Sequence, residues 1–242
     1  KPKLSGSLHL PTLDLRPFLG QKPAQENSEP PRNLAEVYRS LSVATVDLRQ
    51  LNSADADLTL GVGRWLSLPG DVKDVTLQIK LKDGMLEAPV QASITGVALS
   101  GSASADGNAS PPKFNLALGT RDSDLGGLAE LLLGVRGVKG RLGRFDLKLA
   151  AQGDQGNKLV QSLDIRLDVD RGRFSYGNIE GGRPVEFGLD KLAIALPAGK
   201  ALNGDMRGAL LGHPFTAQRH AGALEPTMLQ GRTPLDFILR SG

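Results

Sequence analysis

The chain has 242 residues, of which 40% are hydrophobic, and this apolar content is sufficient for a folded core. Its 29 basic and 26 acidic residues give a net charge of +3, and no dense Lys/Arg tract indicates a nucleic-acid interface. The lack of cysteine excludes disulfides and thiolate chemistry and fits either a reducing cytosol or a cysteine-avoiding periplasm. With aromatic residues at only 4%, the apolar surface must be mainly aliphatic.

The first third of the chain combines a polar insertion with alternating strands. Residues 21–33 (QKPAQENSEPPRN) are Pro-rich and polar, which predicts a loop or insertion. Asn33 is a candidate N-cap for a short helix at 34–41. Apolar residues then recur at every second position in Leu58, Leu60 and Val62, as in a strand with one buried face.

Residues 75–94 predict a hairpin with one apolar face. Asp83-Gly84 is typical of a two-residue turn, and it fixes which residues lie opposite each other. The apolar face pairs Leu81 with Leu86, Ile79 with Ala88, Leu77 with Val90 and Val75 with Ala92. The other face pairs Lys80 with Glu87, Gln78 with Pro89 and Thr76 with Gln91.

The same alternation continues toward the C-terminus. Further strands are predicted around 97–105, 114–118, 145–149, 163–169, 185–189, 192–196 and 235–239. Gly96 changes the alternation as a bulge or turn would. Short helices are predicted at 124–134, capped by Asp124, and at 157–163.

These elements predict an all-β fold, because two or three short helices cannot cover about ten strands. Two architectures need the same one-sided strands. One is an elongated, curved antiparallel sheet that forms a repeating β-groove, and the other is a two-sheet β-sandwich.

Residue patterns typical of enzymes are missing from the sequence. His9, His213 and His220 are the only imidazoles, and none belongs to a His-Glu-x-x-His motif. Neither a Gly-x-Ser-x-Gly elbow nor a phosphate-binding Gly-rich loop is present. Asp55 and Asp57 suggest either a cation site or a solvated strand face. We therefore expect no catalytic residue, no metal and no cofactor.

Two further features allow alternative interpretations. Arg136, Lys139, Arg141 and Arg144 lie among glycines and form either a solvated loop or a contact with lipid phosphates. Trp65, the only tryptophan, either caps one edge of a trough or is a half-buried core side chain.

Several blocks follow one another along nearly the whole chain. They are LPTLDLRPFL (10–19), DLRQLNSADADLTLGVGRWLSLPG (47–70), VKDVTLQIKLKDGMLEAPVQASITGVALSGSASADG (72–107), PPKFNLALGTRDSDLGGLAELL (111–132), GRLGRFDLKLAAQGDQGNKLVQSL (140–163) and GDMRGALLGHPFTAQRHAGALEPTMLQGRTPLDFILRSG (204–242). In this order they resemble the AsmA family of bacterial envelope proteins. The resemblance implies a bridge-like lipid transfer protein: an inner-membrane helix followed by a periplasmic β-groove whose apolar concave face carries acyl chains toward the outer membrane.

The resemblance implies a periplasmic segment of a longer Gram-negative protein that is anchored in the inner membrane and serves phospholipid transport and outer-membrane biogenesis. The chain begins without Met, no signal peptide is visible, and no apolar run approaches the roughly 20 residues of a membrane span. We expect one β-groove segment, with first strands at 1–70, a central repeat at 71–170 and a C-terminal repeat at 171–242.

Two functions follow as expectations. In the first, the apolar face binds phospholipid or another acyl lipid. The groove residues are then Val75, Leu77, Ile79, Leu81, Leu86, Val90, Phe114, Leu116, Leu118, Phe145, Leu147, Leu149, Leu163, Ile165, Leu167, Phe187 and Leu189. In the second, the chain is a scaffold or assembly chaperone that binds envelope proteins through exposed sheet edges, such as the strand Leu235–Leu239. We expect the parent protein to contact the membrane through segments outside this chain. Nucleic acid is not an expected partner.

Overall fold

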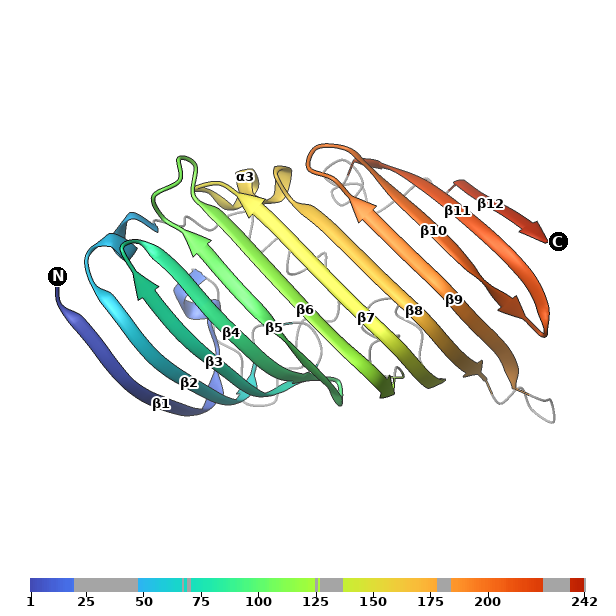
Figure 1. The fold of residues 1–242 in the computed structure, drawn as a ribbon, viewed down its shortest axis with the longest axis horizontal. Coiled ribbons are helices and arrows are strands. Elements are labelled where there is room, and N and C mark those ends of the chain that lie inside the picture. Colours follow the sequence, from blue (N-terminus) through green and yellow to red (C-terminus); the bar gives the residue numbers. More distant parts are fainter. Residues whose placement is uncertain are drawn as a thin grey trace. The chain divides into compact units, whose positions relative to one another are not determined.

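The structure is a computed structural model that describes residues 1–19, 48–66, 68, 71–124, 126, 137–177, 184–223 and 236–241. These residues form a 12-stranded sheet in which the strand order is the chain order (Figure 1). Strands β1 and β12 end this order at opposite sides, so the sheet is open. The predicted all-β fold is confirmed, and the described strands form one sheet instead of the two sheets of a sandwich.

Most strands have 10 to 13 residues. They are β1 Lys3–Leu13, β2 Asp55–Trp65, β3 Val72–Lys82, β4 Met85–Ile94, β5 Val97–Asp106, β6 Lys113–Asp124, β7 Val138–Gln152, β8 Asp164–Tyr176, β9 Val185–Leu196, β10 Ala201–Leu210, β11 His213–Ala223 and β12 Asp236–Ser241. The short helices are η1 Arg16–Leu19, η2 Leu48–Asn52 and α3 Gly156–Gln161. Strand β1 pairs with β2 in parallel, whereas β2 to β5 and β8 to β12 pair successively as antiparallel neighbours.

The chain divides into two compact units. Unit 1 comprises Lys1–Leu118 and Leu149–Leu163, and unit 2 comprises Gly119–Lys148 and Asp164–Gly242. The division falls within β6 and β7, so each unit contains its own group of neighbouring strands.

The predicted hairpin is the centre of unit 1. Asp83 and Gly84 have φ values of 49° and 77°, which is the backbone of a two-residue hairpin turn. The predicted pairs Leu81–Leu86, Leu77–Val90, Lys80–Glu87 and Thr76–Gln91 are confirmed by the register. Thr95 and Gly96, with φ values of 49° and 84°, form a second turn of this kind between β4 and β5.

In the core of unit 1, the alternation of inward and outward side chains along β3 is interrupted. Asp74 has a φ of 50°, and the register between β3 and β4 shifts between Lys73 and Thr76. The shift interrupts the ladder where Val75 was expected opposite Ala92. As a result, Val72 and Val75 are both buried, and they form one cluster with Val62 against which Trp65 and Leu77 pack.

Unit 2 contains the same kind of interruption. Leu142 and Phe145 are three positions apart on β7, yet both are buried. On β8, Arg171 has a φ of 54° and separates Val169 from Gly172, which are both buried as well. The predicted strands at 185–189 and 192–196 are halves of the single strand β9, because its alternation shifts at 190–191 while the strand continues.

The remaining predicted elements have different outcomes. The helix predicted at 157–163 is confirmed as α3. The loop at 21–33, the helix at 34–41 and nearly all of the helix at 124–134 lie outside the described residues. The strand predicted at 235–239 corresponds to β12, of which the backbone is described. Within the described part of the chain, no helix is long and apolar enough to cross a membrane.

Candidate functional site

Unit 1 presents rows of aliphatic side chains that run from strand to strand. Leu60 on β2 is paired with Leu77 on β3, which is paired with Val90 on β4. Directly paired residues project from the same face of a sheet, so these three side chains form one continuous row. All three are only partly buried. A row of this kind is apolar and still accessible.

Strand β6 extends this apolar face. The Asn115 amide donates a hydrogen bond to the Ser104 hydroxyl at 3.3 Å, so these polar side chains share the other face. Their alternating neighbours Phe114 and Leu116 therefore belong to the apolar face. The predicted groove residues of unit 1 other than Val75 are half-buried, namely Leu77, Ile79, Leu81, Leu86, Val90, Phe114, Leu116, Leu118, Leu149 and Leu163.

Unit 2 presents a second apolar face. Val169, Leu192, Met206 and Ala217 are paired in succession on β8, β9, β10 and β11. Leu192 and Met206 in the middle of this row are partly exposed. Of the predicted groove residues in this unit, Phe145, Leu167 and Leu189 are buried, whereas Leu147, Ile165 and Phe187 are half-buried.

Three phenylalanines form an aromatic cluster on the face of unit 2. The ring centroid of Phe187 lies 5.8 Å from that of Phe174 and 5.4 Å from that of Phe215. The Phe174 ring lies against Gly172, where a Cβ would meet the ring at 2.2 Å. Of these three, only Phe187 is among the groove residues predicted from the sequence. The Gly-x-Phe spacing of Gly172 and Phe174 is a signal for such an aromatic–glycine contact.

The basic residues that the sequence analysis grouped together have different surroundings in the structure. Arg144 forms ion pairs with Asp146 and, at 3.7 Å, with Asp170. The Arg141 guanidinium donates a hydrogen bond to the Asp122 carbonyl oxygen at 3.4 Å. Lys139 is exposed, and Arg136 lies outside the described residues. Of the described members, Lys139 is the one best placed to meet an external anion.

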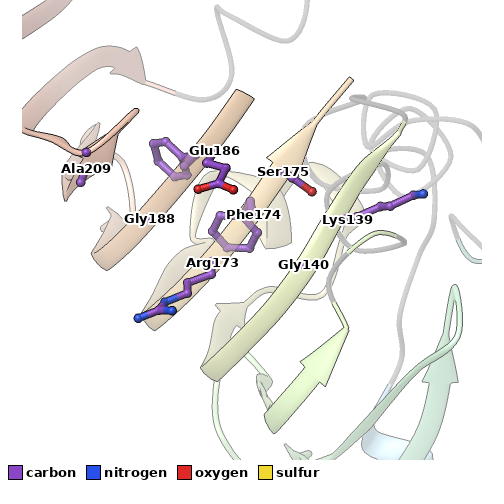
Figure 2. Close-up of a pocket in the computed structure, with 10 residues that line it drawn as sticks. Lys139, Gly140, Arg173, Phe174, Ser175, Glu186, Gly188 and Ala209 are labelled. Carbon is purple, nitrogen blue, oxygen red and sulfur yellow. The ribbon is translucent and has the colours of Figure 1, made fainter. Parts of the chain in front are cut away.

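Lys139 lines a hollow of about 420 Å³ in unit 2 (Figure 2). Arg173 is paired with Gly188 and Ser175 with Glu186, so these residues share the sheet face opposite to Phe174 and Phe187. Gly188 and Ala209 leave space that larger side chains would fill. The complete lining is Lys139, Gly140, Arg173, Phe174, Ser175, Glu186, Phe187, Gly188, Ala209 and Gly212.

The other candidate residues do not come together into a site. His9 and His213 are exposed on different strands, and the side chain of His220 lies outside the described residues. The Asp55 carboxylate accepts a hydrogen bond from the Asp83 N–H at 3.2 Å, which holds the hairpin turn, and Asp57 is exposed. Trp65 is half-buried against the Val62 cluster. No group of three metal-ligating side chains occurs among the residues that the structure describes.

Comparison with known proteins finds no family model, no curated protein and no solved structure that matches this chain. The chemistry of the two apolar faces is therefore the basis for assigning a function.

Proposed function

We propose that the apolar faces of the sheet bind the acyl chains of lipids without catalysis. The observation that carries this proposal is that apolar rows continue from strand to strand with partly exposed side chains: Leu60, Leu77 and Val90 in unit 1, and Leu192 and Met206 in the middle of the row of unit 2. Monomeric proteins rarely leave large contiguous apolar areas accessible unless something binds there.

The chemistry of the faces favours flexible hydrocarbon over a polar ligand. The row of Leu60, Leu77 and Val90 has no hydrogen-bonding side chain. Burial of apolar surface contributes about 25 cal/mol per Å² and requires no directed contact. Such a face gains affinity for any acyl chain and discriminates weakly between lipids.

The biological setting that we propose follows from the resemblance to the AsmA family. The chain would then be a periplasmic segment of a protein anchored in the inner membrane of a Gram-negative bacterium. Its faces would carry phospholipid between the inner and outer membranes during outer-membrane biogenesis.

A scaffold that binds envelope proteins by strand addition is a second candidate. Strand β1 is at one end of the sheet order, and its Leu4 and Leu8 are 59% and 57% exposed. An edge strand with exposed apolar side chains is a template for pairing with another chain.

Lipid mass spectrometry of the purified, stringently washed chain tests the proposal. Phospholipid should co-purify in near-stoichiometric amounts. Leu77→Asp should remove most of it, because the new carboxylate projects from the apolar face of β3. Gln78→Asp on the opposite face is the matched control and should retain the lipid. Circular dichroism should show that both variants are folded. A folded, lipid-free wild-type protein would contradict acyl-chain binding and favour the scaffold.

A further inference from the structure

Three large apolar side chains of unit 2 are exposed on the side of the sheet where β8 and β10 end. Tyr176 at the end of β8 is 52% exposed, and Leu210 and Leu211 at the end of β10 are 45% and 63% exposed. Tyr176 is paired with Val185 and Leu210 with Phe187. Strands β8 and β10 end at these two residues, and both strands end on the same side of the sheet (Figure 1). The Leu211 N–H also donates a hydrogen bond to the Glu186 carbonyl oxygen at 3.1 Å.

Leu211 is an unusual residue for its backbone conformation. Leu211 and Gly212 have φ values of 51° and 84° and connect β10 to β11 in a two-residue turn. Asn, Asp and Gly are favoured in such turns, and the hairpin turn in unit 1 uses Asp83-Gly84. A leucine with positive φ costs backbone strain, and here it also exposes its side chain to water. Neither effect stabilises the fold. Contact of the Leu211 side chain with a binding partner is therefore a better explanation for a leucine at this position.

Positive charge lies beside the turn, on the sheet face opposite to the one from which Tyr176 and Leu210 project. Gly212 of the turn lines the hollow that Lys139, Arg173 and Ser175 also line. Both cations are exposed, and within the described residues neither forms an ion pair with Glu186 of the same hollow. Lysine and arginine supply the charge-assisted hydrogen bonds that phosphate groups accept. Glu186 lines the same hollow, and its carboxylate has the charge that suits the ammonium group of an ethanolamine headgroup.

We propose that this side of unit 2 docks on a phospholipid bilayer surface. Leu210 and Leu211 enter the boundary of the acyl region, Tyr176 lies at the level of the headgroups, and Lys139 and Arg173 contact lipid phosphates. Apolar tips flanked by cations are the combination that interfacial membrane binding requires. Leu210 shares its face with Phe187 of the proposed groove, whereas Leu211 lies in the turn outside the apolar rows, so the docking is tested at Leu211.

Flotation with vesicles of phosphatidylethanolamine and phosphatidylglycerol tests the apolar part of the docking site. Leu211→Asn should weaken binding about tenfold, since a leucine side chain no longer enters the apolar boundary. The same variant should not lower the urea midpoint, because asparagine tolerates positive φ. Met85→Asn is the matched control, since Met85 is 52% exposed beside a turn of unit 1, and it should bind like wild type.

The charged part of the site has its own test. Lys139→Ser and Arg173→Ser should each weaken binding to these vesicles about fivefold. On vesicles of phosphatidylcholine alone, these two substitutions should have a smaller effect. Wild-type binding by Leu211→Asn would overturn the proposal, as would equal losses in Leu211→Asn and Met85→Asn. Leu77→Asp should leave vesicle binding intact, which separates this test from that of acyl-chain binding.

Discussion

At the scale of single residues, burial depends on where each strand interrupts its alternation. Leu142 is 1% exposed although it is out of step with the row that begins at Phe145. Leu142→Ala should lower the free energy of unfolding by about 2–5 kcal/mol, because it leaves a cavity in the core of unit 2. Leu4→Ala, at a position 59% exposed, should change it by less than about 0.5 kcal/mol. Urea denaturation measures both changes, and a small loss for Leu142→Ala would contradict this account of the core.

The sequence could not locate these interruptions. A period-2 pattern predicts one face as long as the alternation is uniform, and it correctly placed Leu77 and Leu167 on apolar faces. Arg171 adopts positive φ although arginine rarely does, so its residue type gave no signal of a bulge. Aspartate adopts positive φ more often, but Asp74 also fits the solvated face of a regular strand. On β7 the alternation that begins at Phe145 does not include Leu142, which is three positions earlier and is also buried.

At the scale of elements, glycines decide how closely neighbouring strands approach. A Cβ at Gly101 of β5 would lie 1.7 Å from the Ala117 carbonyl oxygen of β6, so a side chain there forces the strands apart. Gly101→Ala should cost about 3 kcal/mol of folding stability. Gly96→Ala, with open space around it and a φ of 84°, should cost only the backbone strain of about 1–2 kcal/mol. Thermal unfolding measures the stability of both variants. A larger loss for Gly96→Ala than for Gly101→Ala would show that the close approach of β5 and β6 does not require glycine at position 101.

Elements with a local signal could be predicted, and contacts between distant segments could not. Asp83-Gly84 fixed the β3–β4 register because a two-residue turn leaves one pairing. The parallel pairing of β1 with β2 follows a long connection and has no such signal. The hollow in unit 2 brings together Gly140, Gly188 and Ala209, so it depends on registers that the sequence does not specify.

At the scale of the whole molecule, the decisive property is that the described strands form one open sheet. The strand patterns fit a groove and a sandwich equally well, because each needs one apolar face per strand. Only the strand order separates the two architectures. Within each unit the apolar row keeps partly exposed side chains, such as Leu77 in unit 1 and Leu192 in unit 2. These exposed rows are the physical basis for the proposed binding of lipid.

The most direct test of acyl-chain binding is fluorescence quenching by a phospholipid brominated on its acyl chains. The chain contains no cysteine, so a single introduced cysteine can carry the fluorophore. We expect strong quenching for Leu77→Cys in unit 1 and Ile194→Cys in unit 2. We expect weak quenching for their neighbours on the opposite face, Gln78→Cys and Ala195→Cys. Equal quenching on both faces, or none at Leu77 and Ile194, would contradict the claim that the apolar faces bind acyl chains.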